Sequence, residues 1–179
     1  MIDSVQKLDF LPDGYFYGMV NTYNTSICGL LLYHPHFKQV LDALETQKQG
    51  QLVGLASRIY PALQIRPHEI LDLMRGGKII LGQVTDNLSH MLLNIAYESV
   101  KHLLDKNNPV HEFFKHIRNG ASHGGRWHFL GKEPFRLAEW RGRKITKSME
   151  GNRILDSNIA PGDLVILLWD IEQTLLKKP

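Results

Sequence analysis

The chain has 179 residues, 43% of them hydrophobic, so it can bury one substantial core but is short for two independent domains. Its formal net charge of +3 is compatible with a phosphate-bearing partner without identifying one. Its longest apolar stretches are far shorter than the roughly 20 residues that cross a bilayer, and the single Cys28 cannot form an internal disulfide. The first residues carry no basic segment followed by an apolar one, so we expect a cytoplasmic protein.

Helical periodicity dominates the first half of the chain. Apolar residues recur every three or four positions from Tyr15 to Leu31, which predicts one helix. A second amphipathic helix is expected from Pro35 to about Gln49. Two shorter helices are expected over residues 52–60 and 67–75, and Gly76-Gly77 closes the latter.

The strongest helical signal runs from about Thr85 to Lys106. The predicted core face is formed by Val84, Leu88, Met91, Leu92, Ile95, Ser99 and Leu103. The predicted polar face is formed by Asn87, His90, Asn94, Glu98 and Lys101. This pattern indicates a long helix of a bundle.

The next helix is predicted to begin at Asn108 and Pro109, a cap and a first-turn proline, and to end at Gly124-Gly125. Its predicted inward residues are Val110, Phe113, Phe114, Ile117 and Ala121. From Trp127 to Thr146 apolar and polar residues alternate between glycines, which predicts a small β-meander. A last helix is expected at 161–177, with a core stripe of Leu164, Leu167, Leu168, Ile171 and Leu175.

The segment from Arg118 to His123 carries residues suited to phosphodiester chemistry. Arginine is a permanent cation whose planar fork fits phosphate oxygens, and histidine exchanges a proton near neutral pH. Residues four apart share a helical face, so Asn119 lies beside His123 and could fix its tautomer, while Arg118 lies beside Ser122. The alternative is a plain helix end, in which these cations complement the macrodipole and Gly124 is the stop signal.

This segment resembles the signature of the HEPN superfamily of helical domains, which is an arginine, four to six residues and a histidine, commonly with a polar residue after the arginine. Arg118, Asn119 and His123 fit that signature, and the run Arg-Asn-x-x-x-His-Gly-Gly-x-x-His-Phe is similar to a small bacterial, often plasmid-borne subfamily. The resemblance implies a mainly α fold, a HEPN-type bundle with a four-helix core, short helices and the small β-meander before the last helix. Residues 1–179 would then form a single HEPN-like domain with a β-containing insertion at about 126–150.

The resemblance also implies a homodimer, in which two Arg…His pairs form one composite, metal-independent endoribonuclease site. Cleavage by the ribose 2′-OH needs a base, an acid and a cation, and one histidine per chain cannot fill both proton roles at once. We therefore interpret His123 as general acid or base, Arg118 as the stabiliser of phosphate and transition state, and Asn119 as an orienting or substrate-contacting group. The candidate substrate-binding residues are Ser122, Arg126, His128 and Glu98.

Two of these assignments have plain structural alternatives. Glu98 is a candidate because many members of the superfamily place an acidic residue from a neighbouring helix near the motif. It could instead be a surface residue that pairs with Lys101 or His102. The aromatic residues around His128, Trp127 and Phe129 among them, could stack on unpaired bases or simply pack the β region onto the helices.

RNA is the expected partner, together with a second copy of the chain and, by family analogy, a cognate antitoxin in a defence or toxin-like role. No cofactor is expected, since the chain has no glycine-rich loop of the Walker or dinucleotide type. No metal site is expected either, because His111 and His116 are five residues apart and shared-face ligation on a helix needs four. The alternative function is a non-catalytic helical dimerisation or nucleic-acid-binding module.

Overall fold

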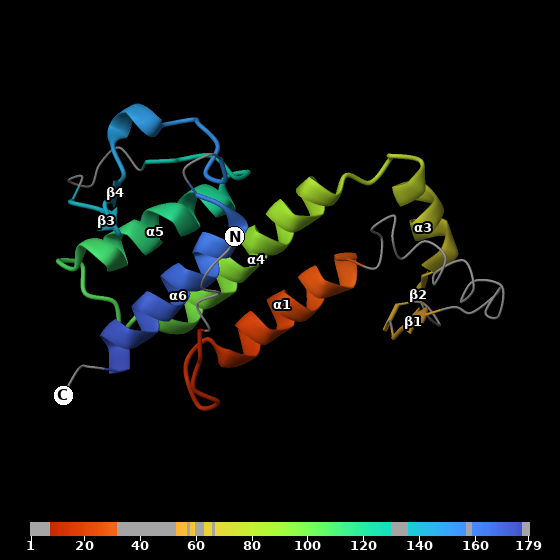
Figure 1. The fold of residues 1–179 in the computed structure, drawn as a ribbon, viewed down its shortest axis with the longest axis horizontal. Helices are drawn as coiled ribbons and strands as arrows, with labels where there is room; N and C mark the ends of the chain where they lie inside the picture. The colour runs from red at the N-terminus through yellow and green to blue at the C-terminus, as the bar shows by residue number, and fades with distance from the viewer. Residues whose placement is uncertain are drawn as a thin grey trace, which may run out of the picture. The chain divides into compact units, whose positions relative to one another are not determined.

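A computed structural model describes residues 8–31, 53–56, 58–59, 63–65, 67–129, 136–156 and 159–176. This part of the chain is mainly helical (Figure 1). It divides into two compact units, residues 1–24 with 86–179, and residues 25–85. The division falls inside helix α1 (Tyr17–Leu31) and inside helix α4 (Leu81–Val100), and the single domain over 1–179 stays a prediction. No helix in the described ranges has the length and apolarity to cross a membrane.

In its described residues, the unit of residues 25–85 contains two short strands, one whole helix and the adjoining ends of α1 and α4. Strands β1 (Val53–Leu55) and β2 (Leu63–Ile65) pair antiparallel, so the helix predicted over 52–60 is wrong. A valine and a glycine at its start are poor helix formers, and pairing with β2 satisfies the backbone instead. Helix α3 (Pro67–Arg75) confirms the next prediction and is followed by Gly76 and Gly77, the second with a φ of +68°. The helix predicted at 35–49 lies outside the described residues.

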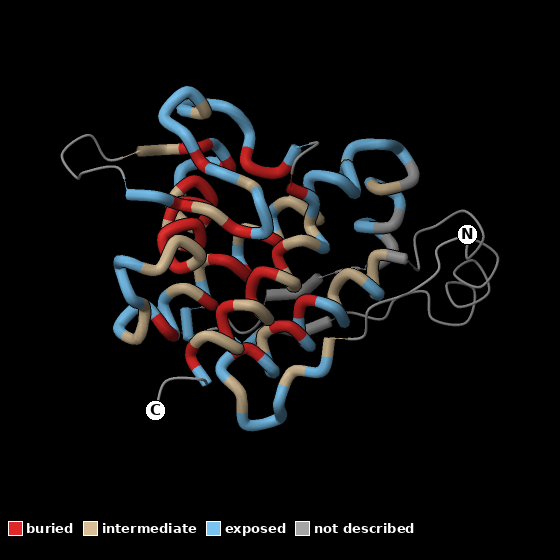
Figure 2. Tube along the Cα trace, turned by 60° about the vertical axis from the view of Figure 1, so that its left-hand side comes forward, coloured by how far each residue is buried: buried red, intermediate tan, exposed pale blue. Residues whose placement is uncertain are grey.

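The unit of residues 1–24 and 86–179 holds the remaining parts of α1 and α4 together with the later helices, and it carries the Arg118 to His123 segment. Helix α5 (Pro109–Ser122) begins as predicted, because the side chain of Asn108 accepts a hydrogen bond from the Val110 backbone nitrogen at 2.9 Å. Helix α6 (Pro161–Leu176) buries all five residues of its predicted core stripe. In Figure 2 the buried residues gather where the helices of this unit face one another.

Aromatic rings join the elements of this core. The Phe114 ring of α5 makes edge contacts with Phe16, 6.5 Å away, and with Tyr97 of α4, 5.4 Å away. The Phe113 ring lies 5.7 Å from the ring of Trp140, which is also buried, and the two planes are inclined by 47°. Edge-to-face pairs of this kind add to the burial of apolar area, so α5 is held firmly on both sides.

The core face predicted for α4 is wrong by part of a turn. Its buried residues are Ser89, Leu92, Leu93, Ala96 and Val100. Met91 and Ile95 were predicted to be buried, but they are 58% and 54% exposed. Apolar residues surround most of this helix, so periodicity alone could not select the face. The small residues of α4 mark the buried face instead. Ser89 is one of them, and its hydroxyl hydrogen-bonds the Tyr23 hydroxyl of α1 at 3.0 Å.

The predicted β-meander is a shorter structure in the residues that are described. Strands β3 (Glu139–Trp140) and β4 (Arg143–Lys144) form a two-stranded hairpin, and a 3-10 turn, η2 (Lys147–Met149), follows. The hairpin turn has positive φ at Arg141 and Gly142, as a tight two-residue loop requires. Arg126 instead forms a separate bridge with Arg153. Trp127 and Trp140 are buried, which favours packing over base stacking for both.

A buried carboxylate ties α6 to the start of α1. The Oε1 atom of Glu172 accepts a hydrogen bond from the Phe16 backbone nitrogen at 3.2 Å, and Oε2 is buried with no hydrogen-bond partner in the described chain. Burial raises the pKa of Glu172, although the backbone donors Phe16 and Tyr15 act against it. The folded protein therefore takes up this proton more readily than the unfolded chain does.

Replacing Glu172 with glutamine is expected to stabilise the protein at pH 8. Because the folded pKa is raised, the wild type loses stability as pH rises from the ordinary value of 4.5 through the folded value. Glutamine keeps an oxygen for Phe16 without the charge, so its melting temperature should exceed that of the wild type by about 2 to 4 °C per kcal/mol recovered. Thermal unfolding at pH 8 and pH 4.5 checks this, and the difference should vanish at pH 4.5. A difference of equal size at both pH values contradicts it, and Glu139→Gln, in a pair with exposed Lys144, is the control.

Candidate functional site

The end of α5 is folded back on itself by two glycines. His123 caps the helix, and its backbone N–H points at the carbonyl oxygens of Asn119 and Gly120. Gly124 and Gly125 then adopt φ of +70° and +72°, a region that favours glycine. The chain that follows is pinned by hydrogen bonds from the Trp127 nitrogen to the Asn152 oxygen and from the Gly151 nitrogen to the Trp127 oxygen, both 2.9 Å. This turn returns His128 to the end of α5.

Two imidazole rings lie together at this turn. The ring centroids of His123 and His128 are 4.0 Å apart, with their planes inclined by 39°. His123 is exposed and His128 is partly exposed. The Nδ1 atom of His128 lies 3.4 Å from Oε1 of Glu150, and the other oxygen of Glu150 accepts a hydrogen bond from the Phe129 nitrogen at 2.8 Å. Glu150 is thus fixed where it can orient His128 and leave Nε2 facing away.

Arg118 lies in a second group of side chains, between α5 and α4. Its Nη2 atom is 2.5 Å from Oε1 of Glu98, and its Nη1 atom donates to the Asn119 side-chain oxygen at 3.3 Å. The guanidinium carbon lies 5.1 Å from the centroid of the Tyr97 ring. Arg118 is 27% exposed, so these contacts orient its fork while leaving it reachable.

Glu98 contacts both the arginine of the motif and a neighbouring lysine of its own helix. One of its oxygens contacts Arg118, as the motif suggested, and the other contacts Lys101 at 2.5 Å, as the plain surface reading suggested. The hydrogen bond from Lys101, and then the charges of Lys101 and Arg118, hold the pKa of Glu98 below its ordinary value. An exposed ion pair of this kind is weak, so a phosphate could displace Glu98 from Arg118.

Ser122, Asn119 and Arg126 occupy different places around the motif. The Ser122 hydroxyl donates to the side-chain oxygen of Asn94 on α4 at 2.5 Å. The Asn119 side chain contacts Arg118, and only its backbone oxygen meets the N–H of His123, so it does not orient that ring as the spacing suggested. Arg126 is exposed and donates to the Gly151 oxygen at 2.8 Å, which braces the turn.

The site therefore consists of two groups that touch different surfaces of α5. The arginine group comprises Arg118, Asn119, Glu98 and Tyr97, and the histidine group comprises His123, His128 and Glu150. Within the described chain, no hydrogen bond or ion pair joins Arg118 to His123. Five residues on a helix correspond to about 140° of rotation, which explains the separation.

Two contributors were missed from the sequence. Glu150 lies 22 residues after His128 in a loop without periodicity, so no spacing pointed to it. His90 was assigned to a polar face, but its ring packs beneath the turn: a Cβ added to Gly125 would lie 2.5 Å from it. Burial lowers the pKa of His90, with the nearby Asp86 acting in the opposite direction, so the ring is held neutral and serves as packing.

The two groups offer nitrogen and oxygen atoms of the kind that bind phosphate, donate protons or accept them. In the described ranges, no set of three or more His, Cys, Asp or Glu side chains is arranged to hold a metal ion. A search of protein-family models, of curated proteins and of solved structures found no match to this chain.

Proposed function

We propose that the chain is a HEPN-type endoribonuclease that cleaves RNA without a metal ion, by attack of a ribose 2′-OH on the adjacent phosphorus. The observation that carries the proposal is the pair of His123 and His128, whose ring centroids lie 4.0 Å apart at the end of the helix that carries Arg118. Acid–base cleavage of RNA needs two proton-transferring groups near a cation, and this end of α5 offers all three.

In the proposed reaction one imidazole removes the proton of the 2′-OH as its oxygen bonds to phosphorus. A second, protonated imidazole gives its proton to the departing 5′-oxygen as the P–O bond breaks. The products are a 2′,3′-cyclic phosphate and a 5′-hydroxyl, and the two histidines have exchanged protonation states. Arg118 stabilises the charge that builds up on the phosphorane oxygens, and its fork is already oriented by Asn119 and Tyr97.

Two arrangements supply the second imidazole. His128 of the same chain is one, oriented by Glu150. His123 of a second copy is the other, in the composite dimer that the HEPN resemblance implies. Arg118 and His123 lie on different sides of α5. A second copy removes this difficulty, because the arginine of one chain can act with the histidines of the other.

The exposed face of α4 supports a dimer of this kind. Met91 and Ile95 are more than half exposed, and they lie on the same side of the helix as Glu98 of the arginine group. Apolar side chains beside a charged site fit the core and rim of a protein interface. The dimer and its role in defence, plasmid maintenance or a toxin pair remain part of the proposal.

The test is cleavage of an end-labelled, mixed-sequence RNA by the purified protein in excess chelator. We expect cleavage to persist and the fragments to end in 2′,3′-cyclic phosphate, which mass spectrometry identifies. Fragments with 3′-hydroxyl ends, or activity that the chelator removes, would refute the proposed chemistry. A folded protein that binds RNA without cleaving it would instead be a nucleic-acid-binding module.

A further inference from the structure

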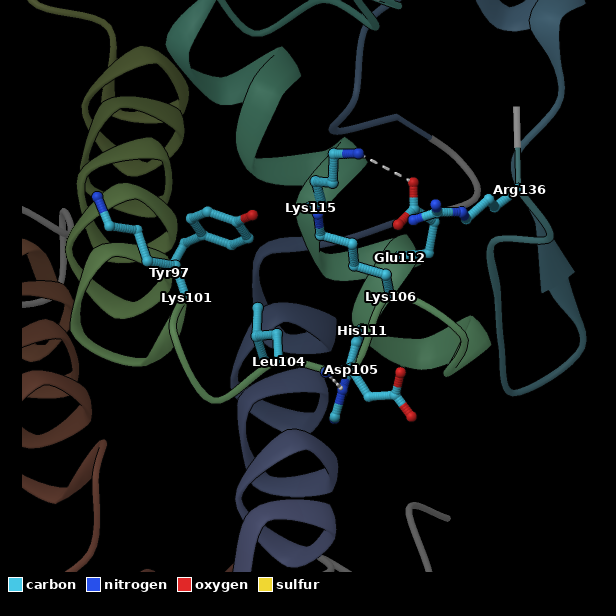
Figure 3. A pocket seen from close by; sticks show the side chains of 9 residues that line it. All are labelled: Tyr97, Lys101, Leu104, Asp105, Lys106, His111, Glu112, Lys115 and Arg136. Carbon is cyan, nitrogen blue, oxygen red and sulfur yellow. Dashed lines mark hydrogen bonds and ion pairs between the residues drawn. The ribbon is translucent and has the colours of Figure 1, made fainter. Parts of the chain in front are cut away.

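A pocket of about 310 Å³ lies beside the arginine group, between the end of α4 and the start of α5 (Figure 3). Four cations line it: Lys101, Lys106, Lys115 and Arg136. Two carboxylates, Asp105 and Glu112, oppose them, so the lining has an excess of two positive charges. Nothing in the chemistry proposed above uses this pocket.

The charged side chains of the pocket differ in whether they already form an ion pair. Glu112 is buried and already paired with Lys115, whose Nζ lies 3.2 Å from its Oε1. Lys106 and Arg136, by contrast, form no hydrogen bond or ion pair with any residue that the structure describes. Exposed cations without a carboxylate partner are the groups that an incoming anion reaches at the least cost.

Tyr97 connects the pocket to the arginine group. Its ring lines the pocket, and the guanidinium of Arg118 lies over that ring, 5.1 Å from the centroid. Burial raises the pKa of Tyr97, with Lys115 and Arg118 acting against this, so the phenol is a neutral donor. The Tyr97 ring and the Leu104 side chain give the pocket an apolar wall, and an aromatic wall among cations suits a base with its phosphate.

We propose that this pocket binds a nucleotide of single-stranded RNA next to the one whose phosphate Arg118 holds. The assignment rests on the proposed function, because it takes the Arg118 phosphate as its starting point. Lys106 and Arg136 each bind one backbone phosphate, while Tyr97 and Leu104 contact the base. The base bound in the pocket thereby sets where the strand lies relative to the bond that is cleaved.

The experiment measures affinity for a fluorescein-labelled 2′-O-methyl RNA oligonucleotide, which cannot be cleaved by 2′-OH attack. The double variant Lys106→Gln, Arg136→Gln removes two phosphate contacts from exposed positions. Each contact with a single strand contributes about 0.7 to the slope of log affinity against log salt, so the slope should fall by about 1.4. The same relation predicts affinity about tenfold lower at 150 mM salt.

The matched control is Lys144→Gln, Lys147→Gln, which removes two exposed lysines at β4 and η2, outside the pocket. We expect it to leave affinity and slope close to wild type. Unchanged affinity and slope in the pocket variant, or an equal loss in both double variants, would overturn the assignment. Binding through the pocket without cleavage of ordinary RNA would refute the nuclease alone, while cleavage with no effect of the pocket variant would refute the pocket alone.

Discussion

Replacing His123 with alanine is expected to slow RNA cleavage by roughly 100- to 10,000-fold, the usual contribution of a positioned acid or base. RNA affinity should be unchanged, because Arg118 and the pocket cations hold the phosphates. His123 is exposed and caps α5 through its backbone, so the fold should survive the change. The measurement is single-turnover cleavage of labelled RNA, with affinity for the 2′-O-methyl oligonucleotide measured on the same preparation.

His102→Ala is the control for this prediction, since His102 is another exposed histidine of the same unit and lies outside both groups of the site. It should cleave at the wild-type rate. A His123→Ala protein that cleaves as fast as His102→Ala would contradict the assignment. Mixing His123→Ala with Arg118→Ala protein then tests how a dimer would share the site. Part of the activity returns if Arg118 of one chain serves His123 and His128 of the other, and none returns if the site lies within one chain or needs His123 from both.

The sequence predicted the elements that depend on local chemistry. The Asn108 cap, the Pro109 start and the glycine stop after Ser122 set the bounds of α5 through backbone hydrogen bonds made within a few residues. The stripe of α6 was predicted correctly as well, from the spacing of three and four residues, although Val165, Ile166 and Trp169 outside the stripe are also apolar. Such signals need no knowledge of distant partners.

Predictions that depended on a distant partner failed. On α4 the choice between Met91 and Ala96 as core residues is decided by what packs against the helix, including Tyr23 of α1. The strand Val53–Leu55 needs β2 to pair with, and a helix was predicted from the sequence instead. In the site, the sequence predicted the motif residues, and the rotation of five residues along a helix accounts for the separation of Arg118 from His123. It could not show that Glu150 lies beside His128, because that contact depends on the turn at Gly124 and Gly125.

Replacing Gly125 with alanine is expected to lower the free energy of unfolding by about 2 to 5 kcal/mol. Positive φ costs a residue with a Cβ about 1 to 2 kcal/mol, and overpacking adds about 1 to 3 kcal/mol. The overpacking follows from geometry, since the new Cβ would lie 2.5 Å from the half-buried His90 ring. Cleavage should fall as well, because the turn that returns His128 to His123 has to shift. Urea denaturation, with the slope compared between proteins, measures the stability.

Gly124→Ala is a close control for this change. Gly124 has nearly the same φ, +70° against +72°, but a Cβ there meets no atom within 4 Å. Gly124→Ala should therefore lower the free energy of unfolding only by the cost of positive φ for a residue with a Cβ, about 1 to 2 kcal/mol. If both alanine variants lose the same free energy, the contact with His90 contributes nothing and the turn is held by backbone conformation alone. If His90→Ala recovers stability in the Gly125→Ala background but not in the Gly124→Ala background, the coupling is specific, and α4 fixes the turn that builds the histidine group.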